Sequence, residues 1–123
     1  MTSTPTLTNL TAYVHVADVQ RSIDYYAHLG FTPTDVTLDN GAPVWALLVG
    51  GAGRLMVAQA DDEIDRSKQG VLFYLYTADV AALRHELAAH NVPVGEIDYP
   101  EYLPNGVIRL EDPDGYVLLI TQR

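Results

Sequence analysis

Three tyrosines and one histidine lie in segments predicted to be extended, and their side chains are suited to a binding site. Tyr13, Tyr74 and Tyr76 carry rings that can stack on a planar ligand and hydroxyls that can hydrogen-bond to it. His15 is the candidate for acid–base work, because an unperturbed imidazole titrates near neutrality. A lone histidine on a strand also fits a hydrogen-bonded structural role, and tyrosines half-bury in many sheets. Both alternatives stay open.

Three further side chains complete the candidate set. Trp45 lies between apolar neighbours, which favours the core over a stacking wall. Tyr102 ends the irregular aromatic segment 99–102, which suits either a lid or a bulge packed against a partner chain. Arg109 shares one strand face with Glu111, so in a cleft these residues could pair with a carboxylate and a cation, and in solvent they would be surface charges. The predicted ligand-binding residues are Tyr13, His15, Trp45, Tyr74, Tyr76, Tyr102 and Arg109.

The residue types and their spacing do not favour a metal-binding site or a catalytic nucleophile. The chain has no cysteine, and no two of its four histidines have a convincing chelating spacing. Glu86 and His90 stand four residues apart, as ordinary helix-surface pairs do. No Ser-His-Asp or glycine-rich phosphate motif is present. We therefore predict no metal and no cofactor.

An internal repeat must position the candidate residues. The run YVHVADV ends at Val19, YLYTADV ends at Val80, and Asp79 follows Asp18 by 61 residues. So long a period indicates two copies of one supersecondary unit, and a cleft between such copies is a natural ligand site.

Each copy is predicted to form one helix and several strands. Asp18 and Asp79 are expected to cap helices over 19–29 and 80–90, which end at Gly30 and Asn91. The expected strands are 11–17, 32–39, 43–49 and 54–60 in the first copy and 72–78, 107–111 and 116–122 in the second, after an irregular stretch 93–104. The predicted modules are 8–60 and 71–123, with a linker at 61–70, in one domain spanning 1–123.

The composition of the chain limits its fold class, its binding partners and its cellular location. A chain of 123 residues with 48% hydrophobic content suits one α+β domain, and 16 acidic against 7 basic residues give a net charge of −9, which disfavours nucleic acid. That charge could steer a cationic ligand or serve solubility alone. No leader segment or membrane span is evident, and we predict a cytoplasmic protein.

Three motifs carry a family resemblance. The sequence VADVQRSIDYY at 16–26, LGF at 29–31 and EDPDGY at 111–116 resemble the vicinal oxygen chelate superfamily, which comprises glyoxalases, bleomycin-resistance proteins and extradiol dioxygenases. The resemblance spans about residues 10–121. It implies two tandem β-α-β-β-β modules that form a half-open mixed-sheet barrel with a cleft between the sheets.

The resemblance also implies a place for a metal ion. Enzymes of the family hold one with His, Glu or Gln from four strands, and the corresponding positions are Thr11, Val57, Leu72 and Leu119. None is a usual ligand and three are aliphatic. The resemblance therefore favours a non-enzyme, while whether the protein is an enzyme is left open. With Leu55 and Gln59, Val57 is expected to share the cleft-facing side of its strand, as Leu119 does in the other copy.

The favoured function is that of a metal-independent protein that sequesters a small molecule of cationic or aromatic character. It is similar to bleomycin-resistance proteins, whose resemblance implies a homodimer with ligand grooves built from both chains. Two alternatives remain. One is a glyoxalase- or dioxygenase-type enzyme with an unusual or absent metal site. The other is a protein-interaction scaffold that uses 99–104 and 61–70 as its contact surface.

Overall fold

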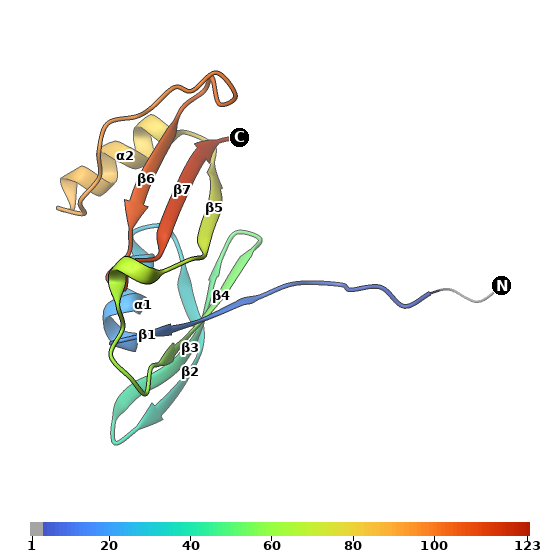
Figure 1. Cartoon of the computed structure of the whole chain (residues 1–123), viewed down its shortest axis with the longest axis vertical. Coiled ribbons are helices and arrows are strands. Elements are labelled where there is room, and N and C mark those ends of the chain that lie inside the picture. Colours follow the sequence, from blue (N-terminus) through green and yellow to red (C-terminus); the bar gives the residue numbers. More distant parts are fainter. Residues whose placement is uncertain (1–3) are drawn as a thin grey trace. The chain divides into compact units, whose positions relative to one another are not determined.

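A computed structural model describes residues 4–123, which divide into two compact units. The first unit ends at Glu63 and the second begins at Ile64, so each predicted module falls in its own unit. Both are α+β, with one α-helix and one mixed sheet apiece (Figure 1). Their closure into a single domain around a shared cleft stays a prediction.

The first unit is a complete β-α-β-β-β module. Its elements are β1 (Ala12–Val16), α1 (Val19–Ala27), β2 (Thr32–Asp39), β3 (Ala42–Gly50) and β4 (Gly53–Gln59). The sheet order is β1-β4-β3-β2, with β1 and β4 parallel and the other neighbours antiparallel. Helix α1 packs on β2, β3 and β4.

The second unit is a shorter version of the same module. Its elements are η1 (Arg66–Lys68), β5 (Leu72–Thr77), α2 (Val80–Ala89), β6 (Val107–Glu111) and β7 (Val117–Gln122). The sheet order is β5-β7-β6, with β5 parallel and β6 antiparallel to β7. Helix α2 packs on β6 and β7. Where β2 stands in the first unit, the second has an irregular segment that makes one bridge, Asp98 to Val107.

The predicted helix starts are confirmed, whereas α1 ends at Ala27 and α2 at Ala89, two residues and one residue before the predicted ends. The Asp18 carboxylate accepts the Arg21 amide at 3.1 Å, and the Asp79 carboxylate accepts the Ala82 amide at 2.9 Å. Each bond satisfies a helical N–H group that would otherwise lack a partner. Both helices begin at the residue after their capping aspartate.

Each sheet has a helix face, which its α-helix covers, and an open face on the other side. In the first unit Val14, Val16, Ala46, Leu48 and Val57 are buried on the helix face. In the second unit Ile108, Leu110, Leu118 and Ile120 are buried in the same way. Because strand side chains alternate, the residues between them lie on the open faces.

One predicted face is wrong. Val57 lies opposite Val14, and Leu55 opposite Ala12, so both belong to the helix face, where Val57 is fully buried. The open-face residue opposite Tyr13 is Met56. The register in the second unit follows the prediction, since Leu119 lies opposite Tyr74 on the open face.

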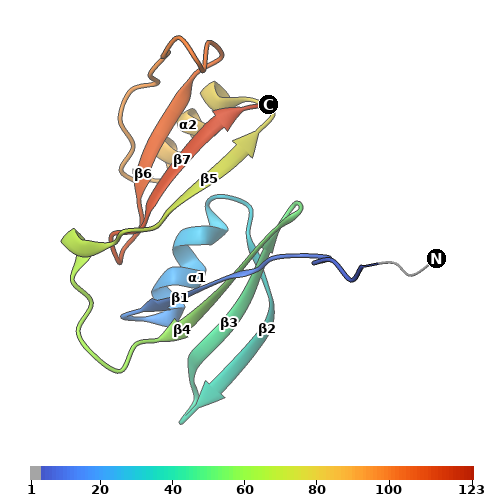
Figure 2. The same cartoon turned by 45° about the vertical axis from the view of Figure 1, so that its right-hand side comes forward.

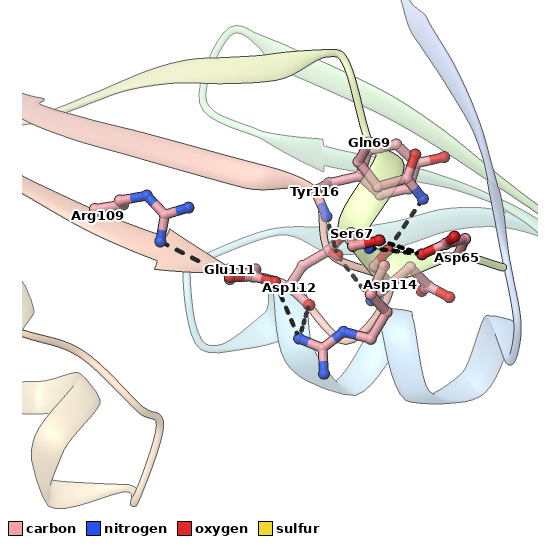
Figure 3. A network of polar contacts seen from close by, with 9 residues as sticks. Asp65, Ser67, Gln69, Arg109, Glu111, Asp112, Asp114 and Tyr116 are labelled. Atoms are coloured by element: carbon pink, nitrogen blue, oxygen red, sulfur yellow. Dashed lines mark hydrogen bonds and ion pairs between the residues drawn. The ribbon is translucent and has the colours of Figure 1, made fainter.

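The predicted linker 61–70 is partly folded into the second unit. The η1 residue Arg66 donates from Nη2 to the Glu111 carboxylate at 3.4 Å, and Gln69 donates to the Asp114 carbonyl at 3.0 Å (Figure 3). The turn before β7 is itself closed, because the buried Asp112 carboxylate accepts the amides of Asp114 and Tyr116 at 2.9 Å each. In the described part of the chain, no helix is long and apolar enough to cross a membrane.

Candidate functional site

A pocket of about 260 Å³ opens on the second unit. It lies between the open face of the sheet and the irregular segment that joins α2 to β6, which runs along the outer side of β6 (Figure 2). Its lining residues are Tyr74, Glu96, Asp98, Tyr102, Leu103, Val107, Arg109 and Leu119.

The floor of the pocket is a row of side chains across three strands. Tyr74 of β5 lies opposite Leu119 of β7, and Leu119 lies opposite Arg109 of β6. Paired residues of neighbouring strands point to the same face, so a phenol, an aliphatic side chain and a guanidinium stand side by side. Val107 precedes Arg109 by two residues and extends the same face.

The wall of the pocket, residues 95–103, is held by few bonds. The bridge between Asp98 and Val107 contributes two backbone hydrogen bonds, of 2.9 and 2.8 Å. A turn then closes where the Leu103 amide donates to the Pro100 carbonyl at 2.9 Å. Tyr102 stands at this turn and is 81% exposed. A ring in that position has the freedom to settle on a ligand.

Arg84 of α2 anchors the near end of this wall. Its Nε donates to the Gly95 carbonyl at 2.7 Å, and its Nη2 lies 3.1 Å from the Glu96 carboxylate. The Arg84 side chain is only 29% exposed, whereas that of Glu96 is 92% exposed. The helix thus fixes the wall mainly through a backbone carbonyl.

The charges of the pocket are unevenly paired. The Arg109 guanidinium lies 3.8 Å from the Glu111 carboxylate, which also pairs with Arg66 at 3.4 Å (Figure 3). Glu96 pairs with Arg84. Asp98 accepts the Tyr99 amide at 3.0 Å, and among residues 4–123 no basic side chain forms an ion pair with it.

Three predicted site residues meet in this pocket, namely Tyr74, Tyr102 and Arg109. Tyr76 lies on the same open face outside the lining, with its ring centroid 5.7 Å from that of Tyr74. The Arg123 guanidinium lies 4.9 Å from the Tyr76 ring centroid, within reach of a cation–π contact.

The other predicted residues gather on the open face of the first unit. The rings of Tyr13 and His15 meet edge to face, with centroids 5.5 Å apart. Trp45 lies opposite Ala58, which lies opposite His15, so all three share this face. Trp45 is half-buried there rather than part of the core that was favoured for it. A ligand-binding role for these residues, and a catalytic one for His15, stay predictions.

Sequence reasoning missed four lining residues, namely Glu96, Asp98, Leu103 and Val107. The first three lie in the stretch that is expected to be irregular, where no periodicity indicates which side chains point together. The available signal was the Glu-Ile-Asp run at 96–98, since residues two apart share a side when the backbone is extended.

The family metal does not fit these sheets. With the register corrected, the four positions are Thr11, Met56, Leu72 and Leu119, which offer no imidazole and no carboxylate. Across residues 4–123, no group of three or more His, Cys, Asp or Glu side chains is arranged to hold a metal ion.

The family model described as "Glyoxalase/Bleomycin resistance protein/Dioxygenase superfamily" matches residues 9–120. No curated protein matches the sequence of the chain.

Several solved structures share the fold. A bleomycin-binding protein complexed with bleomycin has a TM-score of 0.74 and 19% identity, covering 95% of this chain and 99% of its own. A bleomycin resistance determinant encoded on the transposon Tn5 has a TM-score of 0.75 and 18% identity, covering 95% and 98%. An antibiotic-binding protein from a Streptomyces species has a TM-score of 0.72 and 20% identity, covering 97% and 98%. Identities this low establish a common fold.

Proposed function

Because the chain belongs to the glyoxalase, bleomycin resistance protein and dioxygenase superfamily, we propose that it binds and sequesters a small molecule without using a metal ion. The observation that carries this proposal is the pocket on the second unit, where Tyr74, Tyr102 and Arg109 converge. Solved structures of the same fold include bleomycin- and antibiotic-binding proteins, which supports the same class of function.

The chemistry of the lining favours binding over turnover. Two phenol rings supply stacking surfaces, Leu103 and Leu119 supply apolar contact, and the charged groups supply orientation. Within residues 4–123, the lining offers no serine, threonine, cysteine, lysine or histidine as a nucleophile. A set of this kind holds a ligand by shape and charge.

The size of the pocket limits how much of a ligand it encloses. Sites for drug-sized molecules typically span about 300–1,000 Å³, and this pocket measures about 260 Å³. It therefore suits a ring-sized group of a larger molecule, with the remainder of that molecule lying outside it.

We further propose a cytoplasmic homodimer. Leu7 and Leu10 of the N-terminal segment are 93% and 79% exposed, and Leu72 and Tyr76 are more than half exposed on the open face of the second unit. A second copy would remove such apolar surface from water. Light scattering on the purified protein tests this arrangement, and a mass of 13.5 kDa at micromolar concentration would contradict it.

Binding is tested by titrating the protein with bleomycin and with a panel of cationic and aromatic antibiotics, with the heat of binding measured by calorimetry. We expect saturable binding of at least one compound, weakened by Tyr102→Ala. The matched control is Tyr25→Ala, which removes a tyrosine from α1, outside the pocket lining. Absence of saturation across the panel would contradict the proposal.

Metal analysis separates this function from the enzyme alternative. A glyoxalase- or dioxygenase-type enzyme would carry a divalent ion in stoichiometric amount after purification without an affinity tag. We expect less than one ion for every ten chains, and ligand binding that is insensitive to a chelator.

A further inference from the structure

Among residues 4–123, the pocket on the second unit has one lining carboxylate, that of Asp98, which forms no ion pair. Two carboxylates, Glu96 and Asp98, and one guanidinium, Arg109, line it. Arg84 pairs with Glu96 and Glu111 pairs with Arg109, while Asp98 makes its hydrogen bond with a neutral backbone amide. The charge that remains for a ligand is therefore the negative charge of Asp98.

The position of Asp98 directs that charge toward the floor. Asp98 and Val107 form an antiparallel bridge, so their side chains lie on the same side of the backbone pair. Val107 belongs to the open face of β6 and lines the pocket. The Asp98 carboxylate thus borders the space above the sheet.

Two aromatic rings border the same space. Tyr74 rises from β5, and Tyr102 lies on the wall, with Leu103 and Leu119 adding apolar surface. Ring faces attract cations through their quadrupole, and recognition of ammonium groups by aromatic side chains next to a carboxylate follows from that attraction. An anion gains less, because the single guanidinium of the lining already has a carboxylate 3.8 Å away.

We propose that this pocket receives an organic monocation, an ammonium or quaternary ammonium group with apolar substituents, and that Asp98 is its counter-charge. The inference rests on the proposed sequestering function and names the chemical class of its ligand. Its specificity comes from one carboxylate, while Tyr74 and Tyr102 supply contact area.

The test compares two probes of nearly equal shape. Choline carries the quaternary ammonium group, and 3,3-dimethylbutan-1-ol replaces its nitrogen by carbon and is neutral. Each is titrated into ¹⁵N-labelled full-length protein, and shifts of the amides of the wall and of β6 are followed. We expect choline to bind about five- to tenfold more tightly than the neutral alcohol, because a single partly solvated charge pair contributes an affinity gain of that order.

Matched variants identify the carboxylate. Asp98→Asn keeps an oxygen for the Tyr99 amide and removes the charge, so the wall stays folded. Glu101→Gln removes the same charge from the same segment at a residue outside the lining. We expect Asp98→Asn to abolish the preference for choline and Glu101→Gln to change it less than twofold.

Three results would overturn the inference. The first is equal affinity for choline and the neutral alcohol, and the second is an equal effect of Asp98→Asn and Glu101→Gln on that preference. The third is that choline shifts no amide signal even at about 50 times the concentration at which the antibiotics saturate the protein. Its failure is distinct from that of the proposed function, because saturable antibiotic binding with no charge preference would leave sequestration standing. Loss of all antibiotic binding would remove both.

Discussion

Removing the Arg84 side chain should detach the wall of the pocket from α2. Arg84 is the helical residue that reaches this wall, through the Gly95 carbonyl at 2.7 Å and the Glu96 carboxylate at 3.1 Å. In Arg84→Ala both contacts are lost, while the bridge at Asp98 and the turn at Leu103 remain. The segment between residues 95 and 98 should then open more often than it does in the native protein.

The exposure of Arg84 and Glu96 sets how much stability these two contacts give to the wall. A hydrogen bond from a charged donor contributes about 1.5–3 kcal/mol, and partial exposure places this one near the lower bound. The ion pair with Glu96, whose side chain is 92% exposed, adds about 0–0.5 kcal/mol. We expect Arg84→Ala to lower the free energy of closing the wall by about 1.5–2 kcal/mol, which corresponds to a roughly 10- to 30-fold increase in opening.

Hydrogen exchange followed by mass spectrometry measures this opening locally. Peptides covering 95–103 should exchange roughly 10- to 30-fold faster in Arg84→Ala, while peptides of β7 change little. Arg84→Lys should fall between the two, since lysine keeps the charge but lacks the forked donor geometry. Glu96→Gln, which removes only the ion pair, should stay within about twofold of the native rate.

Ligand affinity provides the functional readout of the same series. A wall that opens more often should raise the dissociation constant in the order native, Arg84→Lys, Arg84→Ala. If Glu96→Gln accelerates exchange as much as Arg84→Ala, the carbonyl bond is not what holds the wall. If no variant changes exchange in 95–103, the wall is fixed elsewhere and our reasoning fails.

Further substitutions test the fold. Gly115→Ala places a Cβ 2.8 Å from a backbone carbon of η1, at a residue with a φ of +88°, so the free energy of unfolding in urea should fall by about 2–4 kcal/mol. Gly41→Ala, at a φ of +80°, meets nothing within 4 Å and should lower the same free energy by about 1 kcal/mol. Val57→Asn should lower the free energy of unfolding by about 3 kcal/mol, because it buries an amide on the helix face. Met56 lies on the open face, so a similar loss of stability in Met56→Asn would contradict our register.

Hydrogen bonds from Ser67 hold the pKa of Asp65 below its ordinary value of 3.8, so the η1 turn gains stability above that pH and loses it as the pH falls through the lowered value. In an NMR titration, Ser67→Ala should return the midpoint toward 3.8, and an unchanged midpoint would exclude this cause.

Local signals predicted much of the fold because their causes are local. Asp18 and Asp79 cap helices through amides three residues away, so the sequence around each cap contains the whole interaction. Asn91 ends α2 with a φ of +60°, a conformation that asparagine tolerates. The strand faces of the second unit were also predictable, since Arg109 and Glu111 alternate with buried residues.

The failures depended on contacts that the sequence does not contain locally. Val57 was expected to face the cleft, but its pairing with Val14 and Ala46 puts it on the helix face, since a shift of one residue moves a side chain to the other face. The acidic wall residues Glu96 and Asp98 are positioned by Arg84 and Val107, 12 and 9 residues away along the chain. Tertiary contacts of this kind leave no periodic trace.

The isolated bridge at Asp98 has a consequence for how the protein can change over time. In the first unit β2 is laddered to β3 along nearly its whole length, so an inserted residue would shift many paired side chains at once. The corresponding segment of the second unit has one such pair, and its length and composition can vary without disturbing the order β5-β7-β6. One copy of the repeat can therefore conserve the architecture while the irregular segment of the other copy varies in length and composition.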